Sequence, residues 1–472
     1  MDIISTTILN TPSLSPLPRQ IAEGLLPALI TQTGPAARAA IAAGLRKSLK
    51  RPLFVICSDE TAARSMAGDL RYLLGEEPAV LTGRDLILRD TEVVSRQTEQ
   101  QRLQLLYALQ REAAPVVVCT VPGLLQRTIP AWTLSEAAFV LRCGEGQGPE
   151  AVEPQLLRCG YRRSDMVEGP GQFSRRGGIL DIFSPGANQP IRVEFWGDEI
   201  DSMGFFDTDT QRRTENVEEF RILPACEALP ALGEGGEAAL EKLLRAQSAR
   251  LRRKGGNALA EEKLLQDAER LHVGGHLPWC DRYLPDLYPE YTTALDYIPL
   301  DALVLLDAPA RCGEKAEELM SQTGDDCAVL SESGVPVHGA GDYILEWKQA
   351  CRQLTEFAVI EMDAFTAGRY ELPPKTILTA DVRQLPSYGG STETAIGDVK
   401  HYLEMGFRVA VLCSEERRAD ILFGMLEREG LSPLRGWPQG GLPPRGRCTV
   451  AVGGLSAGLE LPEAALAILT DA

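Results

Sequence analysis

Short apolar runs that alternate with helical patterns constrain most strongly how this chain can fold. Leu53–Cys57 is typical of a buried strand, and apolar residues then recur at helical spacing until Gly75 ends the pattern. A second unit ends with the strand pattern Val116–Thr120, and a third begins with Arg408–Cys413. The first and third units share a Cys-Ser junction, which ordinary strand-to-helix geometry explains and which two related lobes would also produce. We predict an α/β multidomain fold.

Between these units, residues 169–227 contain short strand patterns that place charged and aromatic residues on one face. Pro190 and Gly197 bound the strand Ile191–Trp196. Its alternation sends Ile191, Val193 and Phe195 to the core, and Arg192, Glu194 and Trp196 to the other side. Trp and Arg together are typical of binding hot spots. The alternative is that a neighbouring element covers Trp196 while Arg192 pairs with an acid across the sheet.

Composition limits the class of partner. A chain of 472 residues predicts three or four domains. Its net charge of -18 repels a phosphate backbone unless basic residues are clustered locally. The densest basic stretches, residues 46–51 and 250–254, lie in helical patterns and are interpreted as solvated helix faces.

Cysteine usage and hydropathy indicate the compartment. The eleven cysteines are scattered without a C-x-x-C pair, which is typical of reduced thiols in a cytosolic protein. His272, His276 and Cys280 have a ligand-like spacing, but glycine and proline interrupt the helix that would align them, so we predict no metal site. No basic leader segment or membrane-length apolar run occurs. We expect a cytoplasmic protein without membrane contact.

A position suited to a phosphate-binding loop carries unsuitable residues. After an apolar run, Thr33 and Gly34 lead into an alanine-rich helix. Ala37 stands where a phosphate-binding lysine would be, and Arg38 stands where a Mg²⁺-binding hydroxyl would be. Pro35 removes one backbone N–H that would point at phosphate. The sequence predicts a degenerate nucleotide site. The alternative is an ordinary strand-to-helix turn that never bound a ligand.

A second nucleotide motif is altered in the same way. Leu303–Asp307 is an apolar strand pattern that ends in an acid of the kind that holds Mg²⁺. Ala308 follows where a general-base carboxylate would be needed. No other catalytic constellation emerges from the sequence. We therefore expect a chain with no ATP hydrolysis, no catalytic residues and no cofactor.

Several segments of the chain together carry a resemblance. In order and spacing they resemble the middle domain shared by UvrB and the bacterial transcription-repair coupling factors (Mfd). These segments are Gly160–Arg162, Gly169–Phe183, Ile191–Ile200, Phe206–Asp207, Thr210–Arg212 and Leu223–Glu227. Residues 288–299 resemble the returning part of a UvrB-like lobe, and residues 95–109 are similar to a coupling-factor helix where UvrB has a long hairpin. Residues 454–463 resemble the third domain of the coupling factors.

The resemblance implies a domain plan. In this plan the chain begins with a degenerate RecA-like lobe of the P-loop type, into which a β-rich UvrA-docking domain is inserted. A second, smaller α/β domain follows. The expected parts are residues 1–122 for the first part of the lobe, 123–227 for the β-rich domain, 228–330 for the returning part, 331–345 for a linker and 346–472 for the third domain.

The resemblance also implies a function. The chain would be the N-terminal portion of a coupling factor, a non-catalytic scaffold that recruits UvrA to lesion-stalled RNA polymerase in transcription-coupled nucleotide excision repair. The UvrA-binding residues of the family fall on Arg176, Arg192 and Trp196, the last in place of the more usual phenylalanine. Substituting Arg192 or Trp196 by alanine is expected to abolish UvrA binding and to leave thermal unfolding nearly unchanged.

Other partners and the alternative function follow from the same resemblance. In the whole protein, the C-terminal part would contact this chain and mask the UvrA surface. RNA polymerase and DNA would bind through domains beyond residue 472, where a full-length member carries an ATP-dependent DNA translocase. The alternative is a UvrB-like or helicase-like ATPase that acts on DNA.

Overall fold

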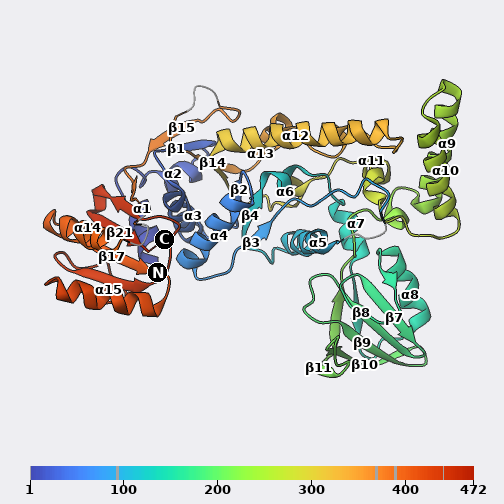
Figure 1. Ribbon diagram of the computed structural model, residues 1–472, viewed down its shortest axis with the longest axis horizontal. Helices are drawn as coiled ribbons and strands as arrows, with labels where there is room; N and C mark the ends of the chain where they lie inside the picture. The colour runs from blue at the N-terminus through green and yellow to red at the C-terminus, as the bar shows by residue number, and fades with distance from the viewer. Residues whose placement is uncertain are drawn as a thin grey trace.

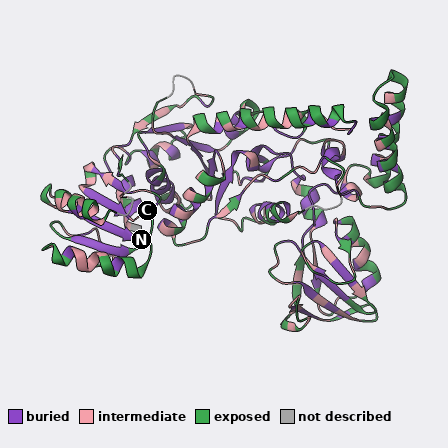
Figure 2. Ribbon diagram, in the orientation of Figure 1, coloured by how far each residue is buried: buried purple, intermediate pink, exposed green. Residues whose placement is uncertain are grey.

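The computed structural model describes residues 2–91, 95–366, 370–386, 388, 391–438 and 441–471. At its centre lies a seven-stranded parallel sheet with the order β15-β1-β14-β13-β2-β4-β3 (Figure 1). The strands are β1 Ala28–Thr31, β2 Leu53–Cys57, β3 Ala79–Leu81, β4 Val116–Thr120, β13 Leu303–Asp307, β14 Ala358–Met362 and β15 Thr376–Thr379. Its inner strands β2, β4 and β13 are buried along their whole length because helices cover both faces, as the burial colours in Figure 2 show.

Helices on the two faces of this sheet enclose two separate cores. Side chains of β2 alternate between them, with Phe54 and Ile56 in one core and Leu53, Val55 and Cys57 in the other. Alanines of α3 allow that helix to lie close to the sheet. The helices of this lobe are α1 Asp2–Leu9, α2 Leu17–Ala22, α3 Pro35–Leu49, α4 Glu60–Leu74, α5 Gln97–Gln110, α6 Val121–Leu125, α12 Pro309–Glu332 and α13 Trp347–Leu354.

A second, six-stranded sheet projects from the lobe, with the order β11-β10-β9-β8-β7-β6 (Figure 1). Its strands are β6 Arg162–Arg163, β7 Gln172–Arg176, β8 Ile179–Phe183, β9 Ile191–Trp196, β10 Glu199–Phe206 and β11 Arg213–Val217. Helix α8 (Pro149–Arg158) lies beside it, and the pair β5 (Phe139–Arg142) and β12 (Glu219–Ile222) joins it to the lobe after helix α7 (Ala131–Ala137).

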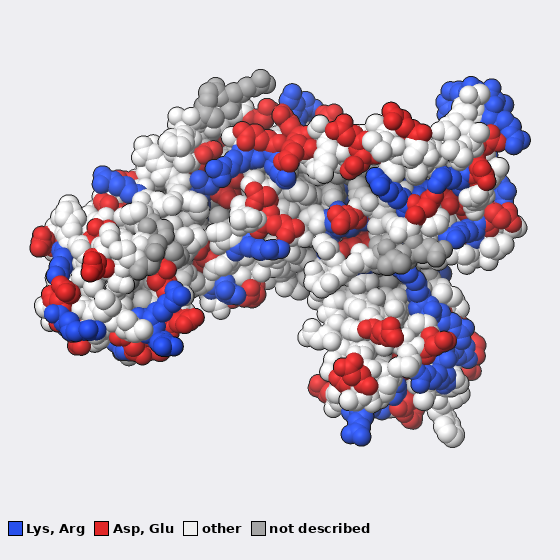
Figure 3. All heavy atoms as spheres, viewed as in Figure 1, with Lys and Arg blue, Asp and Glu red and all other residues white. Residues whose placement is uncertain are grey.

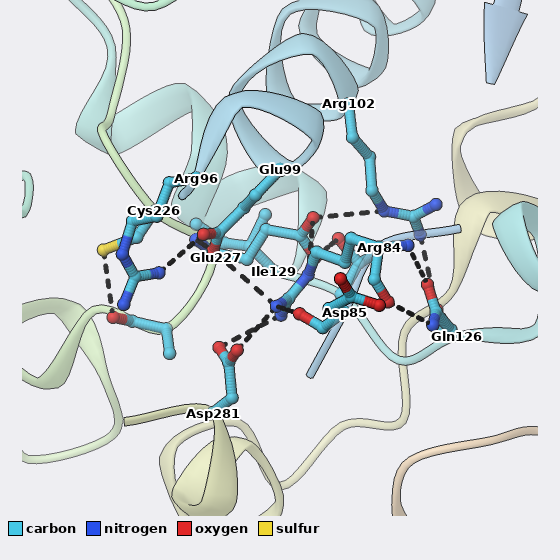
Figure 4. A network of polar contacts seen from close by, with 12 residues as sticks. Arg84, Asp85, Arg96, Glu99, Arg102, Gln126, Ile129, Cys226, Glu227 and Asp281 are labelled. Carbon is cyan, nitrogen blue, oxygen red and sulfur yellow. Dashed lines mark hydrogen bonds and ion pairs between the residues drawn. The ribbon is translucent and has the colours of Figure 1, made fainter. Parts of the chain in front are cut away.

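A buried ionic network fixes this sheet to the lobe at residue 227 (Figure 4). The Glu227 carboxylate lies 3.2 Å from Nε of Arg84 and 3.1 Å from Nε of Arg102. Its backbone N–H donates to the Glu99 carboxylate at 2.7 Å, and Asp281 accepts from Arg84 at 2.6 Å. All five side chains are buried. A shift of the segment that carries Glu227 would therefore leave buried charges without partners, which costs free energy. The network therefore fixes how the second sheet is presented.

After this junction the chain forms a helical hairpin of α9 (Gly236–Lys254) and α10 (Ala258–His272) at the far end of the molecule in Figure 1. The short helices η1 Pro230–Leu232, η2 Cys280–Tyr283, α11 Leu284–Leu287 and η3 Ala294–Tyr297 connect the hairpin to the lobe and to β13. Among the described residues, no cluster of three or more His, Cys, Asp or Glu is placed to hold a metal ion. Within the same residues, no helix is both long and apolar enough to cross a bilayer.

The C-terminal part contains a third sheet with the order β16-β20-β21-β17-β19-β18. Its strands are β16 Arg383–Gln384, β17 Arg408–Cys413, β18 Leu434–Arg435, β19 Cys448–Val452, β20 Leu459–Leu461 and β21 Leu466–Thr470, with helices α14 Thr392–Glu404 and α15 Glu416–Arg428. This part docks on α4, where the Asp69 carboxylate accepts hydrogen bonds from both N and Oγ of Ser456 at 2.6 Å. Trp437 also donates to the Tyr72 hydroxyl at 3.1 Å.

The expected α/β multidomain fold is confirmed, but strand pairing differs from the expected boundaries. Residues 346–379 were expected in the third domain, whereas β14 and β15 flank β1 in the first sheet. The stretch 331–345 was expected to be a linker, whereas Tyr343 and Ile344 are buried against the lobe. The physical reason is that β1 pairs with β14 and β15, which come late in the chain, and β14 lies between β1 and β13.

Candidate functional site

The outer face of the second sheet carries the residues singled out in the sequence. Strand register places Arg176 opposite Ile179, and Ile179 opposite Glu194. Trp196 lies two residues beyond Glu194 on the same face of β9. The opposite face is buried, with Ile191 and Val193 in the core as predicted. Arg176 and Trp196 thus share one solvent-facing surface, which we name the β7–β9 face.

Trp196 is open to solvent. Its exposed fraction is 83%, the largest among the exposed large apolar residues of the described chain. It ends β9 just before the turn at Gly197, whose φ of 60° allows the tight reversal into β10. The possibility that a neighbouring element of this chain covers the indole is therefore excluded. An exposed indole on a protein surface is typical of an interface anchor.

Arg192 behaves differently from Trp196. Its guanidinium binds the Asp181 carboxylate through two hydrogen bonds, of 2.7 Å and 2.8 Å, from the neighbouring strand. The guanidinium carbon lies 4.5 Å from the centre of the Phe206 ring. The hydrogen bonds to Asp181 raise the pKa of the Arg192 guanidinium. Pairing across the sheet, one of the two interpretations left open by the sequence, is thus observed for Arg192.

Arg176 is exposed, and its guanidinium donates only a long hydrogen bond of 3.4 Å to the Asp165 carbonyl. In the described part of the chain, no ion pair is recorded for it. Two other members of the face, Ile179 and Arg213, did not stand out in the sequence. Ile179 is 38% exposed beside Arg176, and Arg213 reaches Ser202 Oγ at 3.2 Å and Glu194 at 3.5 Å. The turn Gly177-Gly178 before Ile179 marks the hairpin end and could have identified that residue.

The residues of the expected nucleotide site also meet. Arg38 on α3 forms an ion pair with Asp307 at the end of β13, and both side chains are almost fully buried. The Arg38 guanidinium also donates to the Thr33 carbonyl at 3.0 Å. Thr33 Oγ1 donates to the Asp363 carbonyl at 2.9 Å. Ala37 is buried in the helical core, and Ala308 begins α12 with a positive φ of 52°.

A pocket of about 620 Å³ opens beside this pair, between Gly34, Asp59, Asp307 and Asp363. A Cβ added at Gly34 would lie 2.6 Å from Gln384 Oε1, so this side chain of β16 lies directly against the turn. Four aspartates and two arginines are among the residues that line the pocket, so carboxylates outnumber cations there and repel phosphate. Its one deeply placed cation, Arg38, is already paired with Asp307.

Comparison with known proteins gives a consistent result. A family model described as UvrB interaction domain matches residues 139–227. The transcription-repair-coupling factor of Bacillus subtilis is 27% identical over 475 residues, which cover 100% of this chain and 40% of that protein. Those of Myxococcus xanthus and Staphylococcus epidermidis are 26% and 24% identical, over 83% and 94% of this chain and 34% and 38% of their own lengths.

The chain thus spans about two fifths or less of the relatives it matches. The matched domain includes every residue of the β7–β9 face. The similarity extends from this domain to the whole chain, including the lobe and the C-terminal part. Together these findings show that the chain is similar along its whole length to part of transcription-repair-coupling factors.

Proposed function

We propose that this chain is a non-catalytic scaffold that recruits UvrA to lesion-stalled RNA polymerase in transcription-coupled nucleotide excision repair. The observation that carries the proposal is Trp196, 83% exposed on a charged sheet face within the segment that matches the UvrB interaction domain. The binding residues are Arg176, Arg192 and Trp196. Ile179 and Arg213 extend the same surface.

The three residues differ in how much each can contribute to the free energy of binding. An indole that becomes buried in an interface contributes on the order of 2 kcal/mol or more. Arg176 has no ion pair to lose among the described residues, so a carboxylate of the partner can bind it at low cost. Arg192 is held by Asp181, so it offers a partner only the edge of an already paired guanidinium. Trp196 and Arg176 are therefore the main anchors.

Among the described residues, the turn at residues 33–38 and the end of β13 lack groups that would bind Mg²⁺-nucleotide productively. A Mg²⁺ ion at Asp307 would have to displace Arg38, whose guanidinium already neutralises that carboxylate. Ala37 supplies no cation to phosphate, and Pro35 supplies no backbone N–H. These features support a scaffold rather than an ATPase.

In the whole factor, RNA polymerase and DNA would bind through parts beyond residue 472, and an ATP-dependent translocase would reside there. A contact with the C-terminal part would mask the β7–β9 face until UvrA is needed. The relatives, of which this chain covers at most 40%, have room for both parts. The cytoplasm is the expected compartment, because eleven cysteines are all free.

A matched pair of tryptophan variants tests the docking proposal. Trp196→Ala should weaken UvrA binding by about 30-fold or more, since about 2 kcal/mol of burial is lost. Trp132→Ala removes another exposed indole, 58% exposed on α7 and outside the matched domain, and should leave the affinity unchanged. Calorimetric titration of UvrA measures both affinities, and thermal melts check the fold. Equal affinities for the two variants would exclude the β7–β9 face as the docking surface.

A further inference from the structure

The far end of the helical hairpin is strongly basic in an acidic protein. Residues 242–260 contain six Lys and Arg residues and no Asp or Glu, whereas the whole chain has a net charge of -18. Figure 3 shows Lys and Arg gathered at this end of α9 and α10. These six residues, which we name the basic tip, are Lys242, Arg245, Arg250, Arg252, Arg253 and Lys254.

The structure arranges part of the basic tip along one ridge. Arg250 and Lys254 are four residues apart on α9, so they lie on the same helix face about 6 Å apart along the axis. Both side chains are exposed. With Asn257 and His338, they line a groove of about 560 Å³ between the hairpin and the end of α12.

Most charges of this ridge are not neutralised within the chain. Arg252 pairs with Glu261 at 2.7 Å, and Arg245 pairs with Glu241 at 2.9 Å. Over the described residues, no ion pair is recorded for Arg250, Arg253 or Lys254. Arg253 donates only to the Ala249 carbonyl of its own helix, at 3.3 Å.

Stabilisation of the helix end does not account for the whole ridge. Cations in the last turn of a helix interact favourably with its dipole, which explains Arg253 and Lys254. It does not explain Arg250, which lies a full turn earlier and still faces the groove. The first acids after the ridge, Glu261 and Glu262, lie near the start of α10, and the first of them already pairs with Arg252.

We propose that the basic tip binds the phosphate backbone of duplex nucleic acid. Arg250 and Lys254 follow one another along an exposed helix face, an arrangement that suits a polyanion whose charges repeat regularly. Each cation that meets a phosphate releases counterions, so a few exposed residues suffice for salt-dependent binding without base readout. The basic tip lies outside the β7–β9 face, and its binding of a duplex is independent of UvrA docking.

Fluorescence anisotropy of a labelled 30-base-pair duplex, titrated with the full chain over a salt series, tests the proposal. The double variant Arg250→Ala/Lys254→Ala should lower the log–log salt slope by about 2 and weaken binding about tenfold or more at 0.1 M salt. The control Arg64→Ala/Arg71→Ala removes the same charge from exposed residues of α4 and should bind like the unmodified chain.

Three outcomes would overturn the proposal. These are no duplex binding by the unmodified chain, binding that the tip variant retains, and an equal loss in the control, which would be an effect of net charge alone. Binding of poly-L-glutamate without binding of duplex would instead identify an acidic protein surface. Circular dichroism and thermal melts of each variant establish that α9 still forms, because alanine favours a helix.

Discussion

At the scale of single residues, Arg192 and Trp196 differ in their expected effect on stability, although they share one face of β9. From the sequence, both alanine variants were expected to leave unfolding nearly unchanged. Trp196 fits that expectation because it is exposed. Arg192 does not, because its loss would leave the Asp181 carboxylate, only 3% exposed, without its partner.

Arg192→Ala should therefore lower the free energy of unfolding by about 2 kcal/mol, less than for a fully buried pair because the arginine is partly solvated. The double variant Arg192→Ala/Asp181→Ala should recover at least half of this loss, since it removes the unpaired charge. Urea unfolding monitored by tryptophan fluorescence measures both effects. A free energy for Arg192→Ala within about 0.5 kcal/mol of the unmodified chain would contradict the pairing.

The pair of Arg38 and Asp307 yields another prediction at this scale. Calorimetric titration with Mg²⁺-ATP should give no heat of binding, and the chain should release no phosphate, because the guanidinium occupies the carboxylate that Mg²⁺ would need. Asp307→Asn serves as the matched variant. Measurable turnover that Asp307→Asn abolishes would support the ATPase alternative instead of the scaffold.

At the scale of elements, the sequence predicted where strands lie in the chain better than it predicted which strands pair with one another. Leu53–Cys57 and Ile191–Trp196 form strands at the predicted residues, because apolar runs and alternation are local properties. The pairing of β14 with β1 was not predictable, since an apolar five-residue strand fits many parallel sheets. The pairing of Arg192 with Asp181 depends on strand register, which the intervening residues 184–190 do not reveal.

The contact between α4 and the C-terminal part should depend on pH. Burial raises the pKa of the Asp69 carboxyl to about 6, while the hydrogen bonds from Ser456 oppose the shift. The folded state thus binds this proton more tightly than the unfolded state, so the contribution of this group to stability is fully present below about pH 4 and is lost as pH rises through about 6. Asp69→Asn cannot ionise, and its amide can still accept from Ser456 N and donate to Ser456 Oγ.

Relative to the unmodified chain, Asp69→Asn should gain up to about 3 kcal/mol of stability between pH 4 and pH 7. Thermal unfolding of both proteins at half-unit pH intervals measures this difference. A stability difference that stays constant over the range would show that Asp69 is ionised throughout.

At the scale of the whole molecule, one lobe supports two projecting surfaces. Both the second sheet and the helical hairpin are inserted between β4 and β13, neighbours of β2 in the first sheet (Figure 1). The network around Glu227 and Arg84 fixes the root of the second sheet. The β7–β9 face and the basic tip are therefore held on a common frame and can act on different partners.

The order in which the strands are synthesised has a consequence for folding in the cell. Both neighbours of β1 lie late in the chain, and β14 begins at Ala358. At typical synthesis rates, β1 must wait about 20 to 70 s for these neighbours to be made. The second sheet is contiguous in sequence, with all its strands between Arg162 and Val217. On a ribosome, the surface that we propose for UvrA can thus be complete before the lobe that supports it.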